Sequence, residues 1–315
     1  MSRTPQQDVS PDRNRDQQVP LVSVILVTNR ASAFLREALD SVARQTYPNV
    51  ELIVVDDGAE DPQFIEVAVS EHSTGRVVHQ PSAGVSAARN AGAAEAKGEL
   101  LVFLDDDDRW RPERLALQSV ALLDAPDAVV SYCGMQSIDD AGAVIAPANQ
   151  FAVNGEVDVA RRATGIILPN VIVRRTAFEQ VGGFEPQLRL AEDLDLILSL
   201  ARLGDFVFVP DVLVDYRTHS ANTTKRYRDL CKGIDGVIRA HLSEAEVRGD
   251  SALVAAFRES LLANQRYAWW SALRAAKADL SQRHPGRAIG AVAWSLRFAP
   301  RGVRSALLRR LRRGN

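Results

Sequence analysis

The sequence predicts an α/β fold, with a mostly parallel sheet covered by helices on both faces and a helical region after it. Two observations predict this class. From residue 21 to about residue 134, short runs rich in valine, isoleucine and leucine alternate with segments of helical periodicity. From Lys225 onward, no run resembles a strand. Strands that alternate with helices are joined by crossovers, so they form a parallel sheet with both faces covered.

The helices between the first strands carry recognisable signals. Ser32 is a suitable N-cap for a helix whose apolar residues follow from Leu35 at i, i+3, i+4 and i+7. Pro112 suits the first turn of a later helix, where its missing N–H costs nothing. Between them, a helix from Ser86 to Gly98 is rich in small residues that allow close approach to a sheet. The strands expected in this half are 22–27, 51–55, 76–79, 100–104 and 128–133.

The alternation of strands and helices ends after residue 140. Two further strands are expected at 166–175 and 206–215, with a helix at 192–203 between them. The rest of the chain is expected to form helices interrupted at Pro285 and Pro300. The expected divisions are a disordered leader (1–20), a main domain (21–222, divided into 21–134 and 135–222) and a helical C-terminal region with a basic tail (223–315).

Composition excludes several classes of protein. The 315 residues are 46% apolar and 25% charged, so the chain is expected to be globular rather than disordered. The net charge of −2 disfavours nucleic acid as a partner. Two cysteines without a CxxC motif exclude a disulfide scaffold and fit a reducing compartment. Without a signal peptide or an apolar run of about 18 residues, the sequence predicts a cytoplasmic protein.

Polar side chains follow three of the long predicted strands, at the point where each strand ends. The segments are Thr28-Asn29-Arg30, Asp56-Asp57 and Asp105-Asp106-Asp107-Asp108. Ligands of such sheets bind beyond the carboxyl ends of the strands, where the strand order reverses. We therefore expect these three segments to share one binding edge.

Four adjacent carboxylates at Asp105–Asp108 repel one another and favour a bound cation. Their hard oxygen atoms suit Mg²⁺ or Mn²⁺, which in turn binds phosphates of a substrate. A solvated acidic turn is the alternative. Which of Asp106, Asp107 and Asp108 would bind the metal directly is left open by the sequence.

Two other segments allow both a ligand-binding and a structural interpretation. The carboxylates of Asp56-Asp57-Gly58 could accept hydrogen bonds from a base or a ribose, or the segment could form a plain Asp-Gly turn. Arg89, in the helix after Gly84, could reach a diphosphate or lie on the surface.

The helix at 192–203 carries two aspartates in its first turn. Helical spacing places Asp193 beside Leu196 and Ile197, whereas Asp195 falls on a more polar face with Ser199. Both carboxylates suit the positive end of the helix dipole, which is the structural interpretation. Among apolar neighbours, Asp193 is the better candidate for a catalytic base.

The C-terminal tail combines positive charge with apolar residues. Seven arginines and no acidic residue lie between Ser295 and Arg313. Such a helix can lie on an anionic membrane surface, and the alternative is a solvated tail. The first interpretation would add peripheral contact with the inner face of the cell membrane.

Five motifs, in this order, resemble those of the family-two glycosyltransferases, which have the GT-A fold. The resemblance covers about residues 21 to 220, and the motifs are VSVILVTNR with FLREALDSVARQTYPNVELIVVDDG, then AGVSAARNAGAAEAKGELLVFLDDDDRW, VIVRR-TAFEQVGGFEP, AEDLDLILSLARLG and YRTHS. It implies inverting transfer of a sugar from a UDP-, GDP- or dTDP-sugar to a hydroxyl of a saccharide or glycolipid. It also implies a place in the synthesis of cell-surface polysaccharide or glycoconjugate, with Mn²⁺ or Mg²⁺ as cofactor.

The resemblance also implies roles for individual residues. Asp193 would be the catalytic base, and Asp107 and His219 would hold the metal. Contacts with the acceptor are expected from residues 135–170 and from the C-terminal helices. The residues assigned to the nucleotide are Thr28, Asn29, Arg30, Asp56, Asp57, Arg89, Asp105 and Asp106. The residues assigned to the acceptor, or to support of the site, are Glu192, Asp108 and Trp110.

Three other functions fit the sequence less well. A haloacid-dehalogenase-type phosphatase also has a D-x-D after a strand, but it expects Thr or Val where this chain has Arg109. A nucleotidyltransferase would need a Gly-rich basic loop after the first strand, and Thr28–Ala31 is not one. A non-catalytic protein that binds sugar nucleotides or carbohydrate stays open, although an intact Glu192-Asp193 pair argues against it.

Overall fold

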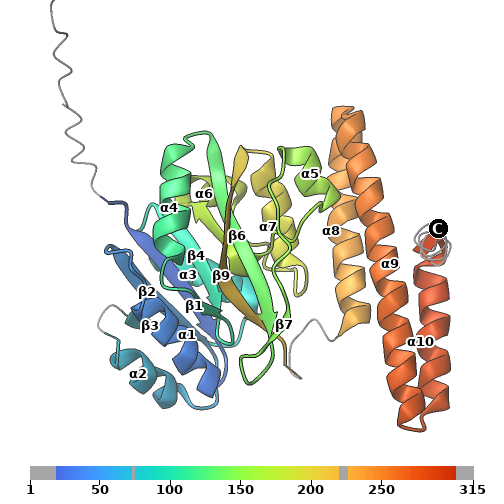
Figure 1. Ribbon diagram of the computed structural model, residues 1–315, viewed down its shortest axis with the longest axis horizontal. Coiled ribbons are helices and arrows are strands. Elements are labelled where there is room, and N and C mark those ends of the chain that lie inside the picture. Colours follow the sequence, from blue (N-terminus) through green and yellow to red (C-terminus); the bar gives the residue numbers. More distant parts are fainter. Residues whose placement is uncertain (1–18, 73–74, 220–225, 303–315) are drawn as a thin grey trace, which may run out of the picture.

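The computed structural model describes residues 19–72, 75–219 and 226–302. Within these ranges, nine strands form one sheet in the order β3-β2-β1-β4-β8-β6-β9-β5, with β7 paired to β6. Helices cover both faces of the sheet, and further helices stand at one end of the molecule (Figure 1). The expected α/β class with a helical C-terminal region is confirmed.

The first four strands form the parallel half of the sheet. β1 lies between β2 and β4, so the strand order reverses on either side of β1. In the register of the pairs, Thr28 of β1 lies opposite Asp56 of β2, and Val27 lies opposite Asp105 of β4. The expected polar edge therefore forms. The bounds are β1 (Val22–Thr28), β2 (Val50–Asp57), β3 (Gly75–Gln80) and β4 (Leu100–Asp105).

The second half of the sheet is mixed. β8 is antiparallel to both of its neighbours, β4 and β6, whereas β6 and β9 are parallel. The strand expected at 166–175 is shorter, because a 3₁₀ turn at Leu168–Asn170 contains Pro169, which has no N–H for a ladder. The bounds are β5 (Arg109–Trp110), β6 (Ala128–Ile138), β7 (Val144–Ala146), β8 (Val171–Arg174) and β9 (Asp205–Arg217).

Local signals in the sequence explain how the helices begin and pack. The Ser32 hydroxyl accepts a hydrogen bond from the Phe34 N–H at 3.1 Å, as expected of an N-cap. A Cβ on Gly92 would lie 2.5 Å from Ile25 Cγ2, so a small residue is required where α3 meets the sheet. The bounds are α1 (Ala33–Ala43), α2 (Pro62–Ser70), α3 (Val85–Glu95), α4 (Arg114–Asp124), α5 (Glu156–Arg161), α6 (Arg175–Val181) and α7 (Glu192–Ala201).

Two apolar cores form, one on each face of the sheet. The core on one face contains Leu26 of β1 with Leu35 and Leu39 of α1. The core on the other face contains Ile25 of β1 with residues of α3, α6 and α7, and it continues into α8 and α9. Adjacent residues of β1 therefore point into different cores, as the two-residue repeat of a strand requires.

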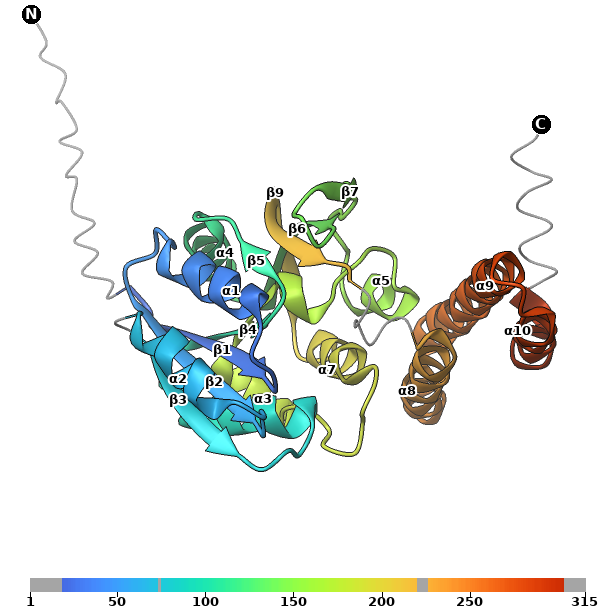
Figure 2. The same cartoon turned by 90° about the horizontal axis from the view of Figure 1, so that it is seen from below.

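The C-terminal region consists of the long helices α8 (Tyr227–Arg248) and α9 (Ser251–Ser281) and of α10 (Pro285–Phe298). Pro285 and Pro300 mark the expected ends of α9 and α10. In Figures 1 and 2, α5 and α7 lie on the side of the sheet that faces α8 and α9. No helix in the described ranges is long and apolar enough to cross a membrane.

Three expectations fall wholly or mainly outside the described residues. They are the leader at 1–20, of which only the last two residues are described, the domain boundary at 222, and the end of the basic tail from residue 303. The proposed contact of this tail with a membrane stays a prediction.

Candidate active site

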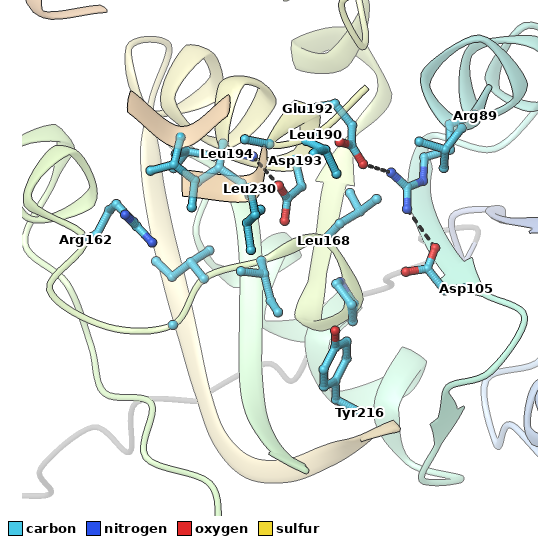
Figure 3. A pocket seen from close by; sticks show the side chains of 18 of the residues that line it. Arg89, Asp105, Arg162, Leu168, Leu190, Glu192, Asp193, Leu194, Tyr216 and Leu230 are labelled. Carbon is cyan, nitrogen blue, oxygen red and sulfur yellow. Dashed lines mark hydrogen bonds and ion pairs between the residues drawn. The ribbon is translucent and has the colours of Figure 1, made fainter. Parts of the chain in front are cut away.

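One cavity of about 990 Å³ begins at the polar edge of the parallel strands and extends to the C-terminal helices. Its near wall includes Thr28, Asn29 and Asp57. Its far wall includes Ile234 of α8 and Tyr267 of α9. The loop between α5 and β8 and the start of α7 form the walls between these ends (Figure 3). The expectation that 135–170 and the C-terminal helices border the site is therefore consistent with the cavity.

The two aspartates at the end of β2 have different surroundings. Asp56 is 3% exposed, and its carboxylate pairs with His79 Nδ1 at 2.9 Å and accepts from the Ala59 N–H at 2.8 Å. Asp57 lines the cavity and accepts hydrogen bonds from the N–H groups of Ala83 and Gly84. Of the two residues assigned to the nucleoside, Asp57 is the one that the structure places on the wall of the cavity.

The acidic segment is not a solvated turn, because its carboxylates have different partners inside the protein. Asp106 is 7% exposed and accepts from Thr28 Oγ1 at 2.6 Å and from Arg30 at 2.7 Å. Asp108 is 1% exposed and accepts from the Arg217 N–H at 2.8 Å. The sequence-based alternative of a surface acidic turn is therefore wrong.

Asp107 is the carboxylate of this segment that combines a place on the cavity wall with contact to His219. Its Oδ2 lies 2.7 Å from His219 Nε2 and 3.1 Å from Arg30 Nη2. Burial raises the pKa of Asp107, and the negative charge of Asp105 raises it further. A positive charge beside Asp107 would offset both effects.

The side chains at the acidic segment offer few ligands for a divalent metal. Within the described residues, no three His, Cys, Asp or Glu side chains converge as a ready-made metal site. Mg²⁺ usually binds one or two carboxylates and completes its shell with waters and substrate phosphates. Asp107 on the cavity wall supplies one such carboxylate, and the ring nitrogen of His219 lies beside it as a second ligand. The residues fit a metal that a diphosphate helps to hold.

Arg89 joins the acidic segment to α7. Arg89 is 5% exposed, and its guanidinium donates to Asp105 at 2.7 Å and to Glu192 at 2.8 Å (Figure 3). The interpretation of Arg89 as a surface arginine is therefore wrong. Two carboxylates engage its guanidinium, so the geometry shows a positioning role, and Glu192 likewise supports the site.

Asp193 projects into the middle of the cavity from the first turn of α7 (Figure 3). Its Oδ1 accepts from the Leu194 N–H at 2.7 Å. Burial raises the pKa of Asp193 to about 6, and the neighbouring carboxylate of Glu192 adds to the effect. A carboxyl of this pKa is ionised at neutral pH and still binds a proton far better than an ordinary aspartate.

Asp195, on the more polar face of α7, is covered in part by α8. Its Oδ1 pairs with His241 Nε2 of α8 at 2.9 Å, and its side chain is 26% exposed. The sequence could not reveal this contact, because α8 begins more than thirty residues later in the chain. Asp195 does not line the cavity, whereas Asp193 does. Asp193 therefore stays the better candidate for the catalytic base, because of its place in the cavity.

Two residues assigned to the acceptor or to support of the site stand behind the cavity wall. Trp110 is 4% exposed in β5, with the Arg114 guanidinium 4.0 Å from its ring centroid. Asp108 is held by the backbone of β9. Neither lines the cavity, so the structure is consistent with support and not with contact to an acceptor.

Three residues that no sequence signal singles out, Arg162, Tyr216 and Tyr267, also line the cavity. Arg162 follows a helix of six residues, which is too short for a clear periodic pattern. Tyr216 belongs to the YRTHS motif, but the resemblance implies no role for it. Tyr267 reaches the site only because α9 packs against α5.

Comparison with known proteins identifies related chains. The model of the family described as "Glycosyl transferase family 2" matches residues 23–182, which is half of the chain. An uncharacterised glycosyltransferase of Rickettsia prowazekii is 29% identical over 68% of this chain and 71% of its own length. The O-antigen biosynthesis protein RfbC of Myxococcus xanthus is 30% identical over 75% of this chain, but over only 19% of its own length.

Solved structures show the same fold. TarS 1-349 of S. aureus, in complex with UDP-GlcNAc, matches with a TM-score of 0.59 at 16% identity, over 87% of this chain and 90% of that one. At this identity the likeness establishes the fold alone. With the family match over half of its length, the chain belongs to glycosyl transferase family 2.

Proposed function

We propose that this glycosyltransferase moves a sugar, with inversion at the anomeric carbon, from a nucleoside-diphospho-sugar to a hydroxyl acceptor. The observation that carries the proposal is the placement of Asp193. It lies in a cavity between the polar edge of the sheet and the C-terminal helices, and its pKa is raised toward neutrality. A single displacement needs such a base on the acceptor side.

The polar edge would bind the nucleoside and the diphosphate. Asp57 offers a carboxylate oxygen to a base or ribose, and exposed Asn29 offers an amide beside it. Arg30, which lines the same wall, provides positive charge for the diphosphate. UDP, GDP and dTDP are the candidate carriers, and the structure of TarS with UDP-GlcNAc supports a nucleotide-sugar donor.

We further propose Mn²⁺ or Mg²⁺ as cofactor, held by Asp107 and His219. When bound, the metal would neutralise charge on the departing diphosphate. Asp107 also pairs with Arg30, which supplies part of the same positive charge. The raised pKa of Asp107 favours a cation at this place.

Asp193 would remove the proton of the acceptor hydroxyl as the hydroxyl oxygen bonds to the anomeric carbon. The bond from that carbon to the diphosphate oxygen breaks, and the electron pair stays with the diphosphate. Glu192 and Arg89 hold the start of α7 against the acidic segment, so Asp193 keeps its position relative to the donor. Positioning of this kind removes much of the entropic cost of the reaction.

The related proteins support a role in the synthesis of cell-surface polysaccharide. RfbC carries the description of an O-antigen biosynthesis protein, and it shares 30% identity with three quarters of this chain. The acceptor would then be a saccharide or a glycolipid.

Titration calorimetry with UDP, GDP and dTDP tests donor binding. At least one of them is expected to bind more tightly with Mn²⁺ or Mg²⁺ than with EDTA, because Asp107 would help to hold a cation that offsets the charge of the diphosphate. Asp107→Ala is expected to remove this gain, whereas Asp108→Ala, which changes a residue behind the wall, keeps more of it. Equal binding of all three nucleotides in EDTA and in metal would contradict the metal role.

The same titration distinguishes the aspartates of β2. Asp57→Ala is expected to weaken nucleotide binding about tenfold and to preserve the metal dependence, since a hydrogen bond to a charged group is lost. Asp56→Ala acts through the turn that it stabilises, so a weaker effect on affinity is expected. If Asp56→Ala weakens binding more than Asp57→Ala does, Asp56 and not Asp57 is the residue that contacts the nucleoside.

A further inference from the structure

Arg162 lies on the wall of the cavity that is formed by the loop after α5. It is exposed to the cavity, and it faces the region of Asp193 and Leu230 (Figure 3). Asp105 and Arg89 lie on the other side of Asp193 in this view. Arg162 therefore stands at the end of the cavity away from the acidic segment.

The charge of Arg162 is not matched by a bonded partner. Arg30 and Arg89 line the same cavity and form short ion pairs, whereas no hydrogen bond or ion pair of the Arg162 side chain occurs in the described structure. Surrounding protein lowers the pKa of Arg162 by desolvation, and Asp193 is the main charge that opposes this effect. Asp158 also lines the cavity, but Arg161 pairs with it at 3.1 Å.

The backbone of Arg162 is also unusual. Its φ of 57° and ψ of 50° place it in the left-handed region, where glycine is at ease and a side chain is strained. The position closes α5, and its N–H bonds to the carbonyls of Asp158 and Val159. A strained residue whose side chain has no bonded partner points to a ligand for that side chain.

We propose that Arg162 binds an anionic group of the acceptor, so that the natural acceptor carries a phosphate or a carboxylate near the hydroxyl that receives the sugar. The proposal rests on the proposed function, because Asp193 marks the acceptor side. The planar guanidinium fork matches the two oxygens of either group. A neutral saccharide would leave this charge without a bonded partner in the cavity.

The test measures binding of three probes that share a ring, by ligand-observed NMR in the presence of saturating UDP. The probes are glucose 6-phosphate, glucuronate and glucose. At least one anionic probe is expected to bind about tenfold more tightly than glucose, and Arg162→Gly is expected to remove the difference. A preference for the phosphate indicates a phosphorylated acceptor, and a preference for the carboxylate indicates an acidic sugar.

Arg283→Gly is the matched control. Arg283 is also an arginine in the left-handed region after a helix, with φ 61°, but it is exposed and does not line the cavity. The Arg283→Gly variant is expected to bind all three probes with the affinities of the parent. Both glycine variants are expected to be at least as stable as the parent toward urea, which separates a ligand-binding role from a structural one.

Three results would overturn the proposal. They are equal binding of glucose and both anions, an unchanged anion preference in Arg162→Gly, and a loss of UDP affinity in Arg162→Gly, which would assign the residue to the donor. If the parent binds no nucleotide, the proposed function fails. Binding of the two anionic probes and of glucose is then measured without UDP. An anion preference that is lost in Arg162→Gly would show that Arg162 binds anions independently of the nucleotide.

Discussion

Asp193→Asn is expected to lower turnover at least about 100-fold while donor affinity is kept, because an amide cannot take the proton of the acceptor. The substitution is nearly isosteric, and the Asn oxygen can still accept from the Leu194 N–H. Product formation at saturating donor measures turnover, and calorimetry with the nucleoside diphosphate measures affinity.

Asp195→Asn is the matched control, since both residues belong to the first turn of α7. Asp195 pairs with His241 outside the cavity, and an amide there can keep a hydrogen bond. A loss of less than about tenfold is expected, because no proton transfer is affected. If Asp195→Asn proves the more damaging, the catalytic assignment is wrong.

The pH dependence follows from the raised pKa of Asp193. The base is active when ionised, so the acid limb of the rate profile is expected near pH 6. Burial disfavours the charged form of Asp193 in the folded protein, so the protein is more stable when this carboxyl is protonated. That extra stability is lost as the pH rises through about 6. Asp193→Asn is therefore expected to raise the free energy of unfolding at pH 8, by at most about 3 kcal/mol, and to have little effect below pH 4.

Arg89→Met is expected to destabilise the protein by about 1–3 kcal/mol at pH 7, because it removes the buried cation that Asp105 and the less exposed Glu192 share. Arg89 also lowers the pKa of Asp193, so its loss is expected to move the acid limb of the rate profile upward. Urea unfolding and the pH profile measure the two effects.

Arg202→Met provides the control for this ion pair. Arg202 ends the same helix and pairs with Glu244 at an exposed site. An exposed pair contributes about 0–1 kcal/mol, so a small change in stability and no shift of the pH profile are expected. A similar loss of stability in both variants would show that the contribution of the Arg89 ion pairs to stability does not depend on their burial.

The parallel half of the fold was predictable because its signals are local. Alternating apolar runs, the Ser32 cap and the small residues before Gly92 each depend on a few neighbouring residues. The second half was harder, because β6 extends to Ile138 only through long-range pairing with β9. The two residues of β5 and the three of β7 are too short to show a period.

The site followed the same division. The polar residues at the ends of β1, β2 and β4 could be placed together because parallel strands end at one edge. Sequence could not choose between Asp56 and Asp57, since the choice depends on a hydrogen bond from His79 in another strand. It also missed Arg162, whose place opposite Asp193 depends on how α5 packs between α7 and α9.

The central claim is that Asp193 activates an acceptor for a single displacement on a sugar nucleotide. Proton NMR of the first product formed from a panel of UDP-, GDP- and dTDP-sugars tests it most directly. The account predicts that one donor gives a product of inverted anomeric configuration with the parent, and at least about 100-fold less product in the same time with Asp193→Asn at the same protein concentration. A product of retained configuration, or undiminished product from Asp193→Asn, would contradict it.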